Sequence, residues 1–128
     1  MDARKGYSAQ GRYLHMAASK VRRVADHVRR VPYPQAVAIL ESLPHKGARL
    51  LTKVVKSAAS NALYENKKLD EEMLYVKELY VNEGPQAKRV WPRGRGRADR
   101  LIKRSCHIVV VLDEIQVRTP PARGSKGA

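Results

Sequence analysis

The sequence predicts an α+β fold: three helices packed on a small antiparallel sheet, with a long β-hairpin that protrudes from the sheet. Residues 17–64 contain three stretches in which apolar side chains recur at helical spacing. Two runs rich in valine and other strand-favouring residues follow, Leu74–Glu83 and Ser105–Leu112. The basic segment between these runs has too few apolar side chains to form a core, so we expect it to project as an arm.

The segment Gly6–Leu14 is predicted to be extended. Tyr7 and Tyr13 flank small residues within it, and aromatic side chains are enriched in strands. Its two glycines weaken a strand. Because Arg12 also lies in this segment, we expect a basic strand at the edge of the sheet.

The first helix is expected from about Ala17 to Arg30. Val21, Val24 and Val28 recur at three- and four-residue spacing, as on the buried face of a helix. A proline at position 32 ends the helix, because the residue before a proline is pushed out of helical geometry. The opposite face is basic. In a neutral protein such a face is more often a solvated surface, but the charge of this chain favours a binding surface.

Two more helices follow. Pro34 suits the first turn of a short helix at Gln35–Ser42, since the N–H that proline lacks would be unpaired there. The predicted buried stripe of this helix is Ala36, Ile39, Leu40 and Leu43. The third helix is expected from about His45 to Tyr64, with a buried face of Leu51, Val54, Val55, Ala58, Ala59, Ala62 and Leu63.

Acidic residues gather after the third helix. Half of the chain's twelve acids fall between Glu65 and Glu83. We expect this acidic region to face away from a polyanion, because an uneven charge distribution orients a binding surface. The later run Ser105–Leu112 is apolar enough to be buried on both faces, and Glu114–Val117 is a candidate continuation of that strand.

We expect one domain over residues 1–117, which includes the hairpin at residues 84–104. A basic flexible tail is expected over residues 118–128, where prolines, glycines and basic residues give no reason for independent folding. Cys106 is the only cysteine, which excludes an internal disulfide and agrees with a reducing compartment. The polar N-terminus has no apolar signal core, so a cytosolic protein is expected.

The charge of the chain points to a polyanionic partner. The net charge is +14, and the isoelectric point is near 10.3. Nucleic acid is the first candidate partner and an anionic membrane surface the second. A membrane-spanning role is not predicted, since no apolar run approaches the roughly 18 residues that a span needs.

The basic arm carries the strongest local signal. Between Pro85 and Arg104 the chain has eight Lys or Arg and a single acid, Asp99. If Gln86–Val90 and Arg97–Lys103 continue the flanking strands, the arm projects about 25–30 Å at roughly 3.3 Å per residue. Two strands alone are marginal in water, so the order of the arm must come largely from its partner. Arginine forks bond phosphate and stack on bases, which favours RNA.

The turn of the arm is expected at Pro92, Gly94 and Gly96, residues that bend the chain readily. Trp91 is the only tryptophan and lies among these charges. It is a candidate for contact with a partner, although it could also fold back onto the hairpin.

These residues resemble the bacterial-type ribosomal large-subunit protein twenty-two. The arm carries most of the resemblance, through Val81-Asn82-Glu83-Gly84-Pro85, Lys88-Arg89, Pro92-Arg93, Gly96-Arg97-Ala98-Asp99-Arg100 and Lys103-Arg104. The helices add Lys20-Val21-Arg22-x-Val24-Ala25-Asp26 and Ser57-Ala58-x-x-Asn61-Ala62. The three motifs stand in the order and spacing of that family, and the resemblance covers about residues 10–112.

The resemblance implies a small body on the outer surface of the large ribosomal subunit and a hairpin threaded through ribosomal RNA to the wall of the nascent-peptide exit tunnel. The implied partners are large-subunit ribosomal RNA, neighbouring large-subunit ribosomal proteins, the nascent polypeptide, and macrolide antibiotics that bind near the tip. It also implies a role in early subunit assembly and a place in bacterial cytoplasmic ribosomes, with an organellar ribosome as the alternative. No cofactor and no metal are implied.

The resemblance and the charge pattern together give two sets of candidate residues. The tip that would line the tunnel is Ala87, Lys88, Arg89, Val90, Trp91, Pro92, Arg93, Gly94 and Arg95. The candidate contacts to ribosomal RNA are Arg12, Lys20, Arg22, Arg23, Lys88, Arg89, Arg93, Arg95, Arg97, Arg100, Lys103 and Arg104. The chain departs from the family pattern at Ala87, where bulkier residues are common, and at Trp91, where a smaller aliphatic residue is common.

An enzyme and a DNA-binding regulator are the competing readings. Four scattered histidines show no metal-ligand spacing, and Cys106 and His107 are strand neighbours that point to opposite faces. Gly94-Arg95-Gly96 is not followed by a helix, as a phosphate-binding loop would be. Residues 19–64 suggest a helix-turn-helix only weakly, because the Pro-Tyr-Pro linker fits that motif poorly.

Overall fold

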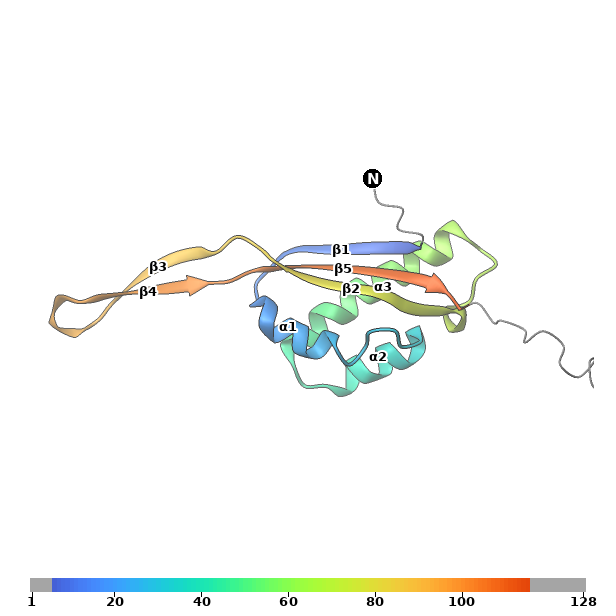
Figure 1. Cartoon of the computed structure of the whole chain (residues 1–128), viewed down its shortest axis with the longest axis horizontal. Helices are drawn as coiled ribbons and strands as arrows, with labels where there is room; N and C mark the ends of the chain where they lie inside the picture. Colours follow the sequence, from blue (N-terminus) through green and yellow to red (C-terminus); the bar gives the residue numbers. More distant parts are fainter. Residues whose placement is uncertain (1–5, 116–128) are drawn as a thin grey trace, which may run out of the picture.

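The computed structural model describes residues 6–115, and Figure 1 shows an α+β body from which a two-stranded arm protrudes. The predicted fold class is confirmed. The helices are α1 (Ala18–Ala25), α2 (Tyr33–Ser42) and α3 (Lys46–Glu65), with single helical turns at Glu71–Met73 and Gly94–Gly96. The strands are β1 (Tyr7–Leu14), β2 (Leu74–Glu83), β3 (Ala87–Pro92), β4 (Ala98–Lys103) and β5 (Cys106–Glu114). The tail predicted at residues 118–128 lies outside the described residues.

The body is built on a three-stranded antiparallel sheet in the order β1-β5-β2. The central strand is β5, and its run Ile108–Leu112 is buried on both faces, as its composition predicts. β1 is an edge strand, also as predicted. β2 has the predicted bounds, while β5 begins one residue later than expected and ends at Glu114. The expected continuation beyond residue 115 falls outside the described part of the chain.

The three helices pack together and against the sheet to form the core (Figure 1). α3 contributes the predicted apolar face, and its alanines at positions 58, 59 and 62 are fully or almost fully buried. Val21, Val24 and Val28 are buried, as their spacing predicts. Pro34 lies in the first turn of α2, where its missing N–H leaves no donor unpaired. The helices therefore follow the apolar periodicity of the sequence.

The end of the first helix differs from the prediction. α1 ends at Ala25, and residues 26–30 form a turn instead of a last helical turn. The backbone of Arg30 takes a left-handed conformation with φ of 61° and donates its N–H to the Val76 carbonyl at 2.8 Å. Val76 N–H in turn bonds the Val31 carbonyl at 3.0 Å. Pairing with β2 therefore ends the helix before the proline at position 32 could.

The arm is a separate two-stranded antiparallel sheet of β3 and β4, paired from Ala87 with Lys103 to Pro92 with Ala98. Its root is fixed by two hydrogen bonds: Gly84 N–H to the Ser105 carbonyl at 3.0 Å, and Ser105 Oγ to the Pro85 carbonyl at 2.6 Å. A Cβ on Gly84 would lie 2.6 Å from Ser105 Oγ. The close approach at the root therefore favours glycine.

Candidate RNA interface

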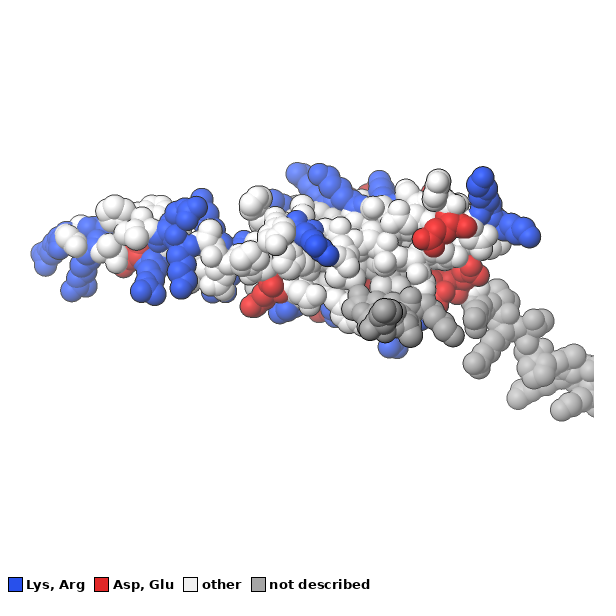
Figure 2. Space-filling view, turned by 90° about the horizontal axis from the view of Figure 1, so that it is seen from above, with Lys and Arg blue, Asp and Glu red and all other residues white. Residues whose placement is uncertain are grey.

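The arm is exposed along its whole length. Every residue from Lys88 to Arg104 is exposed, so the two strands have no core of their own. Figure 2 shows Lys and Arg side chains spread along the arm, with one small acidic area among them. Of the twelve candidate RNA contacts, eight lie here: Lys88, Arg89, Arg93, Arg95, Arg97, Arg100, Lys103 and Arg104.

The only acid of the arm helps to order the tip. Asp99 Oδ2 lies 2.9 Å from Nε of Arg93, and the Arg93 guanidinium lies 5.8 Å from the centre of the Trp91 ring. The Arg93 N–H also bonds the Arg97 carbonyl at 2.6 Å across the turn. Trp91 is still 53% exposed. Arg93 thus stabilises the turn, while the tryptophan leaves much of its surface open to a partner.

The loop after α3 lies at the end of the body opposite the arm (Figure 1). It carries Asp70, Glu71 and Glu72 and follows Glu65, the last residue of α3. This part of the acid-rich region thus lies far from the arm, although the same loop also carries Lys67 and Lys68. Glu83 is an exception, because it ends β2 at the root of the arm. The charge is therefore polarised along the long axis of the molecule, with its most basic part at the arm.

The candidate contacts on the body do not form one cluster. Lys20 and Arg23 are exposed on α1. Arg12, on β1, bonds the Gln10 side chain through Nε at 3.2 Å and Nη2 at 3.0 Å. Arg22 bonds the backbone of the neighbouring strand, and its Nε and Nη2 donate to the Val81 carbonyl at 3.1 and 2.8 Å.

Arg29, in the turn that follows α1, repeats the arrangement of Arg22 seven residues further along the chain. Its Nε donates to the Leu79 carbonyl at 3.2 Å, and Nη1 contacts the Asp26 carboxylate. The two arginines thus cap alternate carbonyls on the outer edge of β2. A bare strand edge is a template for pairing with other chains, so these side chains cover an edge that leads directly into the arm. Sequence spacing did not reveal this, because each partner lies 50 or more residues away.

Cys106 and His107 do not form a catalytic pair. Cys106 is fully buried, and burial raises the pKa of its thiol, so the thiol is poorly suited to act as a nucleophile. His107 is only half-buried, and its Nδ1 accepts the Tyr13 N–H at 3.0 Å. Within residues 6–115, no group of three or more His, Cys, Asp or Glu is placed to hold a metal ion. Among the helices of that range, none has the length and apolarity to cross a membrane.

The exposure of the arm predicts fast amide hydrogen exchange in the free protein. Amides of β3 and β4 are expected to exchange far faster than those of β5, because nothing covers the arm and local opening there disturbs no core. Within residues 6–115, proteases are expected to cut between Pro85 and Lys103. If mass spectrometry showed the arm amides to be as protected from exchange as those of β5, the arm would be stably ordered without a partner, and the prediction would be wrong.

Arg22 and Arg23 form a matched pair for separating structural from RNA-binding roles. Arg22→Gln is expected to lower the free energy of unfolding by about 1–2 kcal/mol, since it leaves the Val81 carbonyl without its charged donor. Arg23→Gln should change stability by less than about 0.5 kcal/mol, as surface substitutions usually do. Urea unfolding of both variants measures this. Equal losses of stability would show that the bond to Val81 contributes nothing.

Comparison with known proteins decides the family. The family model for ribosomal protein L22p/L17e matches residues 9–113. The chain belongs to this family. The match includes the helices, the arm and nearly all of the sheet, and it confirms the resemblance seen in the sequence motifs.

The curated relatives are bacterial large-subunit proteins of similar length. The large ribosomal subunit protein uL22 of Treponema denticola is 58% identical over 114 residues, which cover 89% of this chain and 97% of the relative. The proteins of the same name from Borrelia duttonii and Borreliella burgdorferi B31 are 55% and 53% identical, each over 89% of this chain and 95% of the relative. The likeness thus spans the described body and the arm together.

Proposed function

We propose that this protein is a structural constituent of the large ribosomal subunit, which it joins by binding large-subunit ribosomal RNA. Membership of the ribosomal L22p/L17e family supports the first part of the proposal. The observation that carries the second part is the arm. It has eight basic residues and one acid, all exposed, on two strands without a core and on the turn and root beside them. Neighbouring ribosomal proteins are the further partners, in cytoplasmic ribosomes, and we propose no catalytic role.

The mechanism follows from the chemistry of the arm. Arginine side chains bond phosphate oxygens in a bidentate way, and their binding releases counterions from the RNA. The two strands place the basic side chains along one extended arm, and contacts with RNA on both flanks supply the order that two isolated strands lack. Early binding of this kind would hold separate RNA segments together, which is the proposed role in assembly.

The tip has a different proposed role from the flanks. By the family resemblance, residues 87–95 line the nascent-peptide exit tunnel close to the macrolide site. Of these, residues 87–91 run along β3 from the root of the arm, and residues 92–95 lead into the turn at its end. The half-exposed Trp91, with Arg93 against its ring, would present a rigid, partly apolar surface there. We propose that the nascent polypeptide passes this surface.

Co-sedimentation tests the proposal. The tagged protein, expressed in a bacterium, is expected to sediment with the large subunit, and RNA binding in vitro should weaken steeply as salt rises. Removal of one arginine that contacts phosphate should lower the slope of log affinity against log salt by about 0.7–0.9. A protein that stays at the top of the gradient, or binds RNA independently of salt, would refute the proposal.

A further inference from the structure

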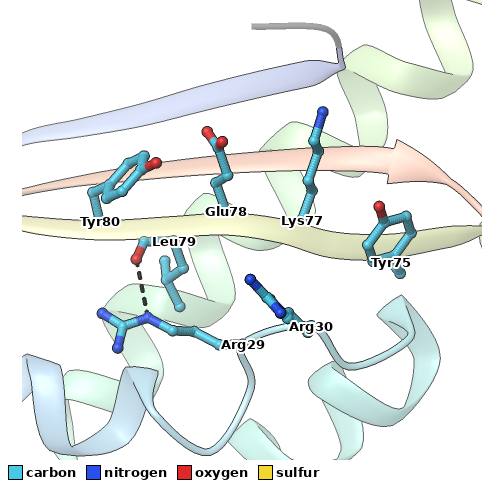
Figure 3. A pocket seen from close by; sticks show the side chains of 7 residues that line it. All are labelled: Arg29, Arg30, Tyr75, Lys77, Glu78, Leu79 and Tyr80. Atoms are coloured by element: carbon cyan, nitrogen blue, oxygen red, sulfur yellow. Dashed lines mark hydrogen bonds between the residues drawn. The ribbon is translucent and has the colours of Figure 1, made fainter.

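A groove on the body, beside β2, contains basic and aromatic residues that the arm and the family motifs do not account for. The hollow has a volume of about 550 Å³ and is lined by Arg29, Arg30, Tyr75, Lys77, Glu78 and Tyr80, among others (Figure 3). None of the six is among the twelve candidate RNA contacts, although Arg29 and Arg30 belong to the basic face of the first predicted helix. Cations and tyrosines around a hollow of this size suit one nucleotide.

The backbone of Arg30, at the edge of the groove, has an unusual conformation. Its φ of 61° lies in the left-handed region, which glycine adopts without strain and arginine does not. The conformation is held by two hydrogen bonds: the Arg30 N–H donates to the Val76 carbonyl, and the Val76 N–H donates to the Val31 carbonyl. Within residues 6–115, the Arg30 guanidinium makes no hydrogen bond or ion pair. Tyr13 and Arg95 also have positive φ, but Arg30 combines this strained backbone with a guanidinium that lines the hollow.

The charges around the hollow leave Arg30 uncompensated. Lys77 pairs with Asp113 at 3.7 Å, and Arg29 is engaged by Asp26 and by the Leu79 carbonyl. Figure 3 shows the Glu78 carboxylate directed away from both arginines. The Arg29 guanidinium is therefore held in one orientation by its partners, whereas the Arg30 guanidinium has no acidic partner among the described residues. Both lie on the same side of the hollow (Figure 3).

Two tyrosines lie at opposite ends of the hollow, Tyr80 at one end and Tyr75 at the other (Figure 3). The Tyr80 ring lies on the same side of β2 as the Glu78 carboxylate, so a nucleotide that contacts both Tyr80 and Arg30 would lie across the outer edge of this strand. Tyr80 is 42% exposed on an edge strand that α1 and the turn already cover. Aromatic rings on a sheet surface stack on unpaired bases, and arginine binds the adjoining phosphate. A protein partner would have to bury the free charge of Arg30, whereas an RNA strand neutralises it.

We propose that this groove is a second RNA-binding site, separate from the arm, that holds one unpaired nucleotide with its phosphate on Arg30 and its base on Tyr80. The inference rests on the proposed function, because it takes large-subunit RNA as the partner. It adds an RNA-binding site on the body to the contacts proposed for the arm.

The first test measures the affinity of the full-length protein for transcribed large-subunit RNA without other proteins. Arg30→Asn is the informative variant, because asparagine tolerates the left-handed backbone but carries no charge. We expect an affinity about tenfold lower and a salt slope reduced by about 0.7–0.9. Lys53→Gln removes one exposed charge from α3, away from the groove, and should leave the affinity unchanged.

Variants of Tyr80 test the base. Tyr80→Ala is expected to weaken binding by about 5- to 100-fold, and Tyr80→Phe should retain wild-type affinity, since stacking needs only the ring. Thermal melts of both variants check that the edge strand still folds. Photocrosslinking to RNA containing 4-thiouridine gives an independent readout, with the adduct expected on the peptide that contains Tyr80.

The outcomes separate the two proposals. Wild-type protein that fails to bind large-subunit RNA refutes the proposed function. Wild-type protein that binds, together with Arg30→Asn and Tyr80→Ala variants that bind equally well, overturns the groove alone. A crosslink from the groove to a ribosomal protein in place of RNA in assembled subunits would overturn it as well.

Discussion

Replacing Pro85–Arg104 with a two-residue Asn-Gly turn should leave the body folded and lower its affinity for large-subunit RNA by about 1,000-fold or more. The deletion removes eight basic residues and one acid. It leaves intact the pairing of β2 with β5, which ends at Glu83 and Cys106. The Gly84 N–H already bonds the Ser105 carbonyl at 3.0 Å, so a tight turn can close the sheet there.

Two measurements check the deletion. Circular dichroism and a thermal melt should show a cooperative body, and the salt slope of RNA binding should fall by about 6–7 if all eight residues contact phosphate. A matched variant that replaces only the three basic residues on α1, Lys20, Arg22 and Arg23, should retain most of the affinity. An unfolded deletion variant, or an armless body that binds as tightly as wild type, would contradict the division into body and arm.

A pair of isoleucines predicts the largest contrast in stability. Ile108 on β5 is fully buried, and Ile102 on β4 is 39% exposed. Ile108→Ala is expected to lower the free energy of unfolding by about 2–5 kcal/mol, through lost burial and the cavity left behind. Ile102→Ala should cost less than about 0.5 kcal/mol, because the arm contributes nothing to the core.

Urea unfolding of the two variants measures this contrast, and both variants carry the same change from isoleucine to alanine. A domain of this size has about 5–15 kcal/mol of stability in total, so the loss at position 108 would be a large fraction of it. Similar losses at both positions would mean that the arm is coupled to the body, against the geometry of an exposed two-stranded sheet.

Much of the fold could be predicted because local and global signals agree. The β2 strand has the predicted bounds, and β5 is buried on both faces, as its unbroken apolar run indicates. The arm was predictable from its flanks: two strand-like runs around a basic segment leave a hairpin as the shortest connection. Apolar periodicity predicted α2 and α3 to within two residues at each end.

What could not be predicted depends on contacts between distant segments. The proline at position 32 indicated a helix that lasts to about Arg30, but α1 ends at Ala25 because the turn pairs with Val76 on β2. The bond from Arg22 to Val81 has the same origin. Nothing in a basic helix distinguishes an arginine that caps a strand edge from one that faces solvent. The groove around Arg30 was missed for this reason too.

A photocrosslink from the arm to a nascent chain tests most directly whether the arm lines the exit tunnel. A photoreactive amino acid replaces Lys88 on β3 or, as a control, Tyr64 on α3, which is 84% exposed on the body. Each variant is incorporated into ribosomes that hold a stalled, radiolabelled nascent polypeptide. We expect label on the Lys88 variant and none on the Tyr64 variant. If the Lys88 variant stayed unlabelled in ribosomes shown to contain it, or if both variants were labelled equally, the arm would not line the tunnel as proposed.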